Sequence, residues 1–154
     1  MIRAGSLGTL IAADLLERGA RPAGVVLIAP VRDSTIVRRA ATARRGAFLG
    51  MLADITMRSP GAPDLVDVLS TSSLPILVML PETDVYLSRR EARAISAACT
   101  GRELTVIEVP GDHQTIILAS WGLEMTDSFA GRQTGRLRDA EAAFLARLRA
   151  TVEK

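Results

Sequence analysis

Uninterrupted apolar runs constrain the fold of this 154-residue chain more than any other feature. Val25–Ala29 and Pro75–Leu80 contain no polar residue, and Leu104–Val109 is a third, largely apolar run of similar length. Runs of this kind are typical of strands that are covered on both faces, as in a parallel sheet. Segments with helical spacing of apolar residues lie before and between them, over Leu7–Arg18 and Ser88–Ala98, and the second begins with Ser88 and Glu91 at the spacing of a capping box. The chain therefore predicts an α/β fold built from parallel βαβ units with right-handed crossovers.

The long segment between the first two runs is too irregular for a further βαβ unit. Arginines crowd its first half, and apolar residues that include Phe48 and Leu52 follow. We expect residues 31–73 to form a helical, lid-like insertion within a single domain, residues 1–154. A solvated helix face is the favoured interpretation of the arginines, and a site for an acidic ligand is the alternative. After an irregular stretch that follows His113, residues 137–152 predict a closing amphipathic helix.

Composition argues against several classes of protein. The chain has 19 basic and 17 acidic residues, 3% aromatic residues and no dense basic tract, which disfavours nucleic-acid binding. No apolar run approaches the length that spans a membrane. The single cysteine, Cys99, forms no internal disulfide and no leader-like segment begins the chain, so we expect a cytoplasmic protein. No dinucleotide or P-loop pattern occurs, and we expect neither a cofactor nor a metal ion.

The sequence Ala4-Gly5-Ser6-Leu7-Gly8 places a serine between small residues, immediately before a helical pattern. We interpret it as a nucleophile elbow, the sharp strand-to-helix turn that raises a serine hydroxyl above the edge of a sheet. The bend favours small residues two positions before and two positions after the serine, and Ala4 stands where glycine is usual. Taken alone the pattern is weak, because a serine followed two positions later by glycine is common by chance.

Asp84 and His113 are candidates for the groups that activate such a serine. Asp84 follows the run Pro75–Leu80, and His113 follows the run Leu104–Val109. The carboxyl ends of parallel strands meet at one edge of a sheet, where the sites of α/β proteins form. A serine needs a base within hydrogen-bond reach, and the base needs a carboxylate that fixes its tautomer. The alternatives are an ordinary turn aspartate and an ordinary loop histidine, while Asp112 adjoins His113 and is poorly placed to be its acid.

With these motifs in the order serine, aspartate, histidine, the chain resembles the C-terminal half of an α/β-hydrolase. The resemblance covers most of residues 1–113 and rests on AGSLG, PILVMLPETD and LTVIEVPGDH. It implies a partial α/β-hydrolase fold of about four parallel strands with flanking helices. It also implies a serine hydrolase that cleaves a carboxylic ester or thioester through an acyl-enzyme. Ser6 would be the nucleophile, His113 the base and Asp84 the residue that orients it, and the Leu7 N–H would be one oxyanion-hole donor.

The resemblance leaves out the N-terminal strands of that fold and the loop with its second oxyanion-hole donor, so we expect an exposed sheet edge. A second copy of the chain or another protein chain would cover that edge. The expected substrate is a small molecule with an apolar acyl group of small or medium size, if Phe48 and Leu52 line its pocket. Two alternatives stay open. One is a hydrolase-like interaction domain without catalysis, and the other is a phosphate-binding turn at Gly5-Ser6-Leu7-Gly8.

Overall fold

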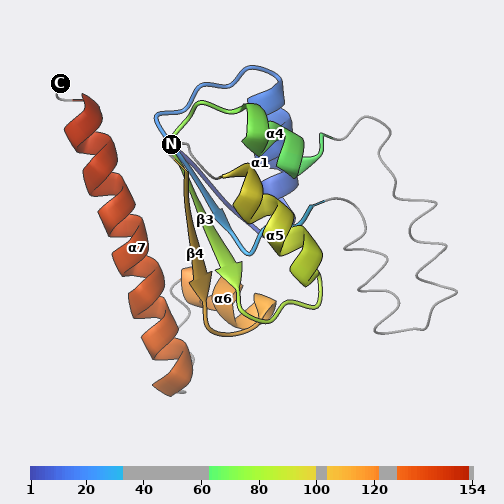
Figure 1. Ribbon diagram of the computed structural model, residues 1–154. Coiled ribbons are helices and arrows are strands. Elements are labelled where there is room, and N and C mark those ends of the chain that lie inside the picture. Colours follow the sequence, from blue (N-terminus) through green and yellow to red (C-terminus); the bar gives the residue numbers. More distant parts are fainter. Residues whose placement is uncertain (33–62, 100–103, 122–127, 153–154) are drawn as a thin grey trace, which may run out of the picture.

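The computed structural model describes residues 1–32, 63–99, 104–121 and 128–152. Within these residues, four parallel strands form one sheet in the order β1-β2-β3-β4. The strands are β1 (Ile2–Gly5), β2 (Val25–Ile28), β3 (Ile76–Pro81) and β4 (Leu104–Val109). Because all four strands run in the same direction, their carboxyl ends lie at one edge of the sheet, close to α6 in Figure 1.

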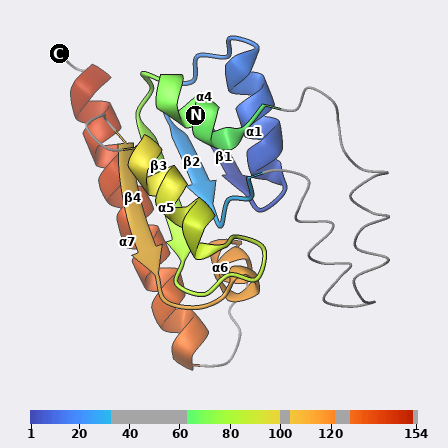
Figure 2. The ribbon, with the colours of Figure 1, turned by 45° about the vertical axis from the view of Figure 1, so that its right-hand side comes forward.

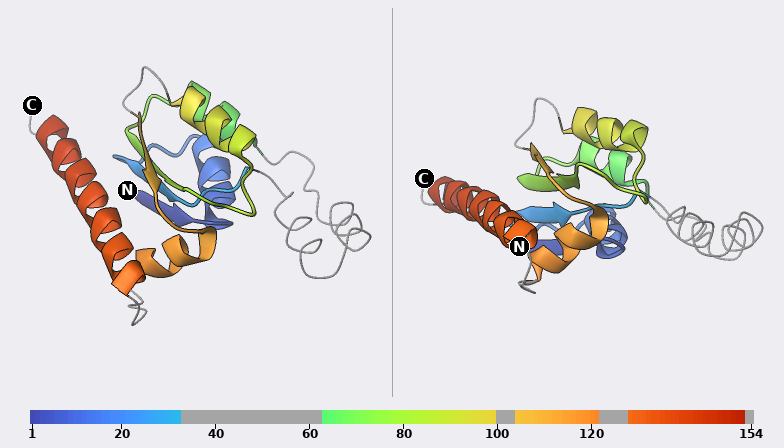
Figure 3. Two further views of the ribbon diagram at one scale, coloured as in Figure 1. Left: turned by 60° about the horizontal axis from the view of Figure 1, so that its bottom comes forward. Right: turned by 90° about the horizontal axis from the view of Figure 1, so that it is seen from below.

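Helices cover both faces of this sheet. One face carries α1 (Gly8–Glu17), α4 (Leu65–Thr71) and α5 (Arg89–Ala98), and α7 (Ser128–Val152) lies along the other (Figures 1 and 2). The short helix α6 (His113–Ser120) follows β4 and packs against α7 and β2. In the two views of Figure 3, the sheet lies between these two layers of helices. The described residues thus form the layered α/β architecture that the alternating strands and helices predicted.

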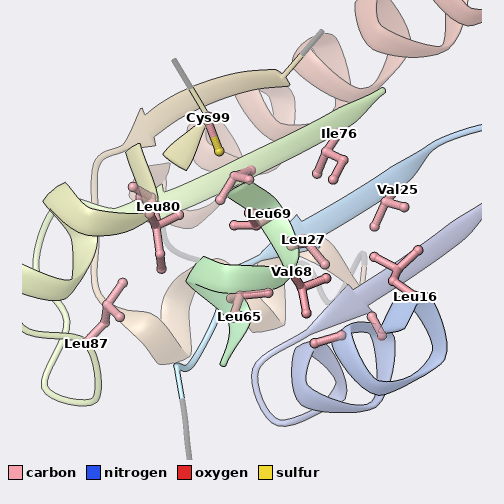
Figure 4. Close-up of a cluster of buried hydrophobic side chains, with 14 residues drawn as sticks. Leu16, Val25, Leu27, Leu65, Val68, Leu69, Ile76, Leu80, Leu87 and Cys99 are labelled. Atoms are coloured by element: carbon pink, nitrogen blue, oxygen red, sulfur yellow. The ribbon is translucent and has the colours of Figure 1, made fainter. Parts of the chain in front are cut away.

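The face that carries α1, α4 and α5 holds the larger cluster of buried apolar side chains. Alternate residues of β2 and β3 enter it, because successive side chains of a strand point to opposite faces of the sheet. The labelled members in Figure 4 are Leu16, Val25, Leu27, Leu65, Val68, Leu69, Ile76, Leu80, Leu87 and Cys99. Every residue of β2 is buried, which confirms the prediction of a strand covered on both faces.

The opposite face of the sheet packs against α6 and α7. Val26 of β2 and Phe144 of α7 belong to the cluster of buried apolar side chains on this side. Arg3 of β1 links the strand to both helices, since its Nε donates to Glu141 Oε1 at 2.8 Å and its Nη2 donates to the Ser120 carbonyl at 2.9 Å. The strand that leads into the predicted elbow is therefore held from this face as well.

Most of the predicted elements are confirmed, with differences at the start and end of the chain. Few residues precede Ser6, yet Ile2–Gly5 form a strand of four residues that leads directly into it. Residues 113–120, expected to be irregular, form α6, and α7 begins at Ser128 rather than at Leu137. The capping box expected at α5 is present, with Ser88 and Glu91 as its two members.

Only the two ends of residues 31–73 lie within the described part of the chain. At one end, α4 belongs to the layer that covers the sheet, and its Leu65 and Leu69 are fully buried. Asp64, the N-cap residue of α4, forms an ion pair with Arg32 at 2.8 Å. Phe48 and Leu52 lie outside the described residues, so the lid-like insertion stays a prediction. In the described ranges, no helix combines the length and apolar character that a membrane crossing requires.

Candidate active site

Ser6 occupies the turn between β1 and α1 and has a left-handed backbone, with φ of 51°. This conformation is costly for a residue with a side chain, so neighbouring contacts must hold it. The Ser6 N–H donates to the Ile28 carbonyl at 3.0 Å, and the Ser6 carbonyl accepts from the Thr9 N–H at 3.0 Å. Ser6 thus has the strained backbone, between a strand and a helix at the carboxyl edge of the sheet, that the predicted nucleophile elbow requires.

The residues beside Ser6 show where the turn needs small side chains. A Cβ added to Gly5 would lie 3.0 Å from Ile117 Cδ1, whereas a Cβ added to Gly8 would lie 3.9 Å from Ala4 Cβ. The second distance is an ordinary van der Waals contact, so the methyl group of Ala4 fits opposite Gly8 without crowding the turn. The tighter steric limit falls on Gly5, the residue directly before the serine.

His113 is the first residue of α6, and it follows the turn that ends β4. Its neighbour Asp112 is the N-cap residue, whose Oδ1 accepts from the Thr115 N–H at 2.8 Å. That hydrogen bond is the main reason why the pKa of Asp112 is lowered. His113 is 7% exposed, and its Nε2 lies 2.8 Å from Ser6 Oγ. Asp112 therefore caps the helix that carries the histidine, and the carboxylate that meets the ring comes from elsewhere.

Asp84 is that carboxylate, and it lies in the turn after β3 with its side chain 3% exposed. Its Oδ2 lies 2.9 Å from His113 Nδ1. Its Oδ1 accepts from the Tyr86 N–H at 2.7 Å and from the Leu87 N–H at 3.2 Å. Both oxygens thus have donors, which offsets the cost of burying the group and fixes the direction of the carboxylate.

These contacts assign the two ring nitrogens of His113. A carboxylate only accepts hydrogen bonds, so Nδ1 carries the hydrogen that is donated to Asp84. In the neutral ring Nε2 then has a free lone pair, to which the Ser6 hydroxyl donates. Such an arrangement can remove the proton from Ser6 Oγ as the oxygen attacks and can stabilise the imidazolium that forms.

Backbone hydrogen bonds tie the turn after β3 to the turn after β4. The Glu82 N–H donates to the Val109 carbonyl at 2.9 Å, and the Thr83 N–H donates to the Gly111 carbonyl at 3.1 Å. The Thr83 hydroxyl donates to the same carbonyl at 3.2 Å. Gly111 has φ of 122°, a conformation that side chains disfavour. The pairing of the two strands therefore continues into the turns that carry the acid and the base.

Tyr86 and Thr9 also contact the site, although neither was predicted from the sequence. The Tyr86 ring lies edge-on to the His113 ring, with centroids 4.8 Å apart and planes at 76°. An aromatic residue two positions after a predicted acid was the available signal for Tyr86. Thr9 donates from its hydroxyl to the Ser6 carbonyl at 2.7 Å, and nothing in the sequence distinguishes it from an ordinary helix residue.

Leu7, the predicted oxyanion-hole donor, is the N-cap residue of α1. N–H groups at a helix N-terminus have no partner within the helix and favour nearby negative charge. Phe48 and Leu52, the predicted substrate-binding residues, lie outside the described part of the chain.

A cavity of about 260 Å³ adjoins the acid turn and is lined by residues that include Asp84 and Ser88. A cavity of about 460 Å³ between α1 and α4 lies at the opposite, amino edge of the sheet.

The described residues contain one cysteine and no cluster of metal ligands. Cys99 is buried in the core, and burial raises the pKa of its thiol to about 11. A thiol in this state is largely protonated at neutral pH and is a poor nucleophile. Over the described ranges, no three His, Cys, Asp or Glu side chains gather as metal ligands would.

Comparisons with known proteins give matches in structure. No protein-family model and no curated protein sequence matches the chain. An esterase of Pyrococcus furiosus is 14% identical and matches with a TM-score of 0.59, over 94% of this chain and 53% of its own length. An enol-lactonase of Burkholderia xenovorans is 15% identical, with a TM-score of 0.56 over 94% of this chain and 64% of its own. An α/β-hydrolase from the metagenome of Lake Arreo, Spain, is 22% identical, with a TM-score of 0.52 over 99% of this chain and 50% of its own.

The four-stranded parallel sheet, its two helical layers and these matches show that the chain has a partial α/β-hydrolase fold. The fold and the resemblance found in the sequence are thereby confirmed. The chain spans between 50% and 64% of the length of these three solved structures.

Proposed function

We propose that the chain is a serine hydrolase that cleaves carboxylic esters or thioesters through an acyl-enzyme. The observation that carries the proposal is the continuous hydrogen-bonded path from Ser6 Oγ through His113 to Asp84, with distances of 2.8 and 2.9 Å. Three different strand ends supply these residues, and the strained backbone at Ser6 presents its hydroxyl to the histidine. The names of the structural matches, an esterase and an enol-lactonase, agree with chemistry at an acyl carbonyl.

In the first step, Ser6 Oγ forms a bond to the acyl carbon while its proton passes to His113 Nε2. The carbonyl oxygen becomes an oxyanion, for which the Leu7 N–H at the start of α1 is the proposed donor. The bond from the acyl carbon to the leaving oxygen or sulfur then breaks, and the leaving group takes the proton from His113. Asp84 stabilises the imidazolium between these events.

In the second step, water attacks the acyl-enzyme. His113 Nε2 accepts one water proton as the water oxygen bonds to the acyl carbon. The ester bond to Ser6 then breaks, and Ser6 Oγ recovers a proton from His113 as the carboxylic acid leaves. The cycle restores the neutral ring and consumes one water for each ester or thioester.

The substrate side of the proposal rests on the sequence. Apolar residues of the 31–73 segment, Phe48 and Leu52 among them, would line the acyl side of the pocket and favour a small or medium apolar acyl group. Phe48→Ala and Leu52→Ala should then change the chain-length preference among p-nitrophenyl esters. An unchanged preference in both variants would count against this assignment.

We also propose that a second copy of the chain, or another chain, covers the β1 side of the sheet. Within the described residues, β1 pairs with β2 alone, and the adjacent α1 exposes Leu7, Ile11 and Leu15. Unpaired strand edges and contiguous exposed apolar side chains are features of association surfaces.

The buried, unpaired state of Cys99 agrees with a reducing compartment, and we propose the cytoplasm.

The test of the proposed function is labelling with a fluorophosphonate probe, followed by peptide mapping of the modified residue. We expect modification at Ser6, none in Ser6→Ala, and a strong decrease in His113→Ala. Ser70→Ala, which removes an exposed serine hydroxyl from α4, is the matched control and should label as the parent does. A chain that is folded by circular dichroism but never labels would contradict the proposal and favour a hydrolase-like domain without catalysis.

A further inference from the structure

Thr9 is a fully buried polar residue in the first turn of α1, with 0% exposure. Its hydroxyl has one hydrogen, and the 2.7 Å contact with the Ser6 carbonyl takes it. The Val31 carbonyl is 3.5 Å away and too distant to compete, while the Val31 N–H donates to Thr9 Oγ1 at 3.2 Å. One hydroxyl thus joins the serine turn to the segment that leaves β2.

The Ser6 carbonyl belongs to the same peptide unit as the Leu7 N–H. No cis peptide bond occurs in the described residues, so the C=O and N–H of this unit point in opposite directions. The Thr9 hydroxyl and the Thr9 N–H, at 3.0 Å, both hold the carbonyl toward the interior of α1. The Leu7 N–H is thereby directed away from the helix, and no backbone carbonyl of the described residues accepts from it.

We propose that Thr9 is a positioning residue for the oxyanion site, and this inference rests on the proposed hydrolase function. Its hydroxyl fixes the plane of the Ser6–Leu7 peptide and so fixes the direction of the Leu7 N–H, the donor that meets the developing negative charge. A hydrogen bond to the carbonyl of a peptide also polarises its N–H, which strengthens that donor.

Backbone strain in the two turns that Thr9 contacts explains why a hydroxyl is needed at this position. Ser6 has φ of 51° and Ala29, at the end of β2, has φ of 45°, so two neighbouring turns hold non-glycine residues in the left-handed region. A non-glycine residue in this region is disfavoured and persists only where surrounding contacts fix it. Thr9 contacts the chain at Ser6 itself and at Val31, two residues after Ala29, and it therefore restrains both turns together.

The experiment compares Thr9→Val, which keeps the shape but loses the hydroxyl, with Thr9→Ser, which keeps the hydroxyl. Hydrolysis of p-nitrophenyl acetate gives kcat and KM, and phenylboronic acid, which forms a tetrahedral adduct with a serine, gives an inhibition constant. Loss of a whole oxyanion donor typically lowers kcat by about 10²- to 10³-fold. In Thr9→Val the Leu7 N–H stays in place but is no longer held by the hydroxyl, so we expect kcat to fall by only about tenfold. KM should stay within about twofold, and boronate affinity should fall in parallel with kcat. Thr9→Ser should recover most of both.

A matched control is Thr71→Val, which removes a hydroxyl that donates to a helix carbonyl of α4, away from the site. It should leave kcat unchanged. His113 is the only histidine in the sequence, so its imidazole Cε1–H and Cδ2–H NMR signals can be assigned directly and should be the same in Thr9→Val as in the parent. If Thr9→Val does not fold, Thr9→Ala takes its place in the comparison with Thr9→Ser.

Equal kcat in the parent and Thr9→Val, a loss confined to KM, or an equal loss in Thr9→Ser would each overturn the role of Thr9. These outcomes differ from a failure of the proposed function, because in that case the parent itself neither hydrolyses the ester nor reacts with the fluorophosphonate probe.

Discussion

The ring of Tyr86 meets the ring of His113 edge to face, with centroids 4.8 Å apart and planes at 76°. The backbone N–H of Tyr86 also donates to Asp84 Oδ1 at 2.7 Å. One residue therefore limits the tilt of the imidazole and fixes the carboxylate that faces it. The two contacts come from different parts of the residue, so a side-chain substitution removes only the first.

Replacing Tyr86 should separate these two contacts. Aromatic pairs contribute about 0.5–1.5 kcal/mol beyond their buried area, which corresponds to about a two- to tenfold loss of fluorophosphonate labelling rate in Tyr86→Ala. Tyr86→Phe keeps the edge-to-face contact and should label at a rate close to that of the parent. Labelling rates of the three proteins, measured at one probe concentration, check this order. Equal rates in Tyr86→Ala and the parent would show that the ring contact does not position the base.

Replacing Asp84 and Asp112, the two carboxylates near His113, with asparagine should have very different effects on activity. Asp84→Asn keeps the shape but offers an amide to His113 Nδ1, which favours the wrong tautomer and in a serine triad lowers kcat by about 10⁴. Asp112→Asn keeps an N-cap for α6, because Asn caps helices as well as Asp does, and should lose little activity. Steady-state hydrolysis of p-nitrophenyl acetate checks both. A comparable loss in the two variants would contradict the assignment of Asp84 as the acid.

The arrangement of Ser6, Asp84 and His113 could be predicted because it depends on strand ends. Each residue follows an apolar run or a short strand, and parallel strands bring their carboxyl ends to one edge whatever the details of packing. The contacts of Thr9 and Tyr86 depend on side chains that meet only after packing. Nothing in the local sequence gives their partners, so they could not be predicted in the same way.

Helix α6 was not predicted because its sequence lacks the alternation of apolar and polar residues that marks an amphipathic helix. His113–Ser120 is apolar through its middle, and Ile116 and Ile117 are both buried, so no polar stripe marks a solvent face. The usable signal was Asp112, an N-cap whose carboxylate accepts from the Thr115 N–H. By contrast, α5 was predicted with its start because Ser88 and Glu91 form a capping box on a strongly amphipathic segment.

Acid should weaken the fold partly through Asp64. Burial by itself would raise the pKa of Asp64, but the Arg32 guanidinium and the Val66 N–H outweigh it and hold the pKa below its usual 3.8. A lowered folded-state pKa stabilises the fold above the unfolded value and loses that effect as pH falls through the folded value. Asp64→Asn should therefore lower Tm at pH 7, with a difference from the parent that shrinks below about pH 4. Asp67→Asn, which removes a charge from the same helix, is the control, and thermal denaturation across pH checks both.

The exposed face of α1 should drive self-association of the isolated chain. Leu7, Ile11 and Leu15 are 52%, 65% and 43% exposed and recur every four residues, so they lie on one side of the helix beside β1. Ile11→Lys together with Leu15→Lys should shift the chain toward monomer in light scattering coupled to size exclusion. Val85→Lys changes a residue that is 73% exposed at the acid turn, and it should leave the oligomeric state unchanged. A monomeric parent at all concentrations would leave another protein chain as the partner of this surface.

The close approach of α7 to the loop before β2 should make Gly24 intolerant of a methyl group. A Cβ at Gly24 would lie 2.6 Å from Leu148 Cδ1 and 3.3 Å from Phe144 Cζ. Overpacking of this kind typically costs about 1–3 kcal/mol, so Gly24→Ala should unfold at lower urea concentration than the parent. Gly135→Ala, where a Cβ meets nothing within 4 Å, should be neutral or stabilising because alanine is the better helix former.

Leu148→Ala removes the atoms nearest to the added methyl group, so the double variant Gly24→Ala with Leu148→Ala should lose less stability than the sum of the two single variants. Strict additivity would show that α7 does not pack on Gly24 in solution.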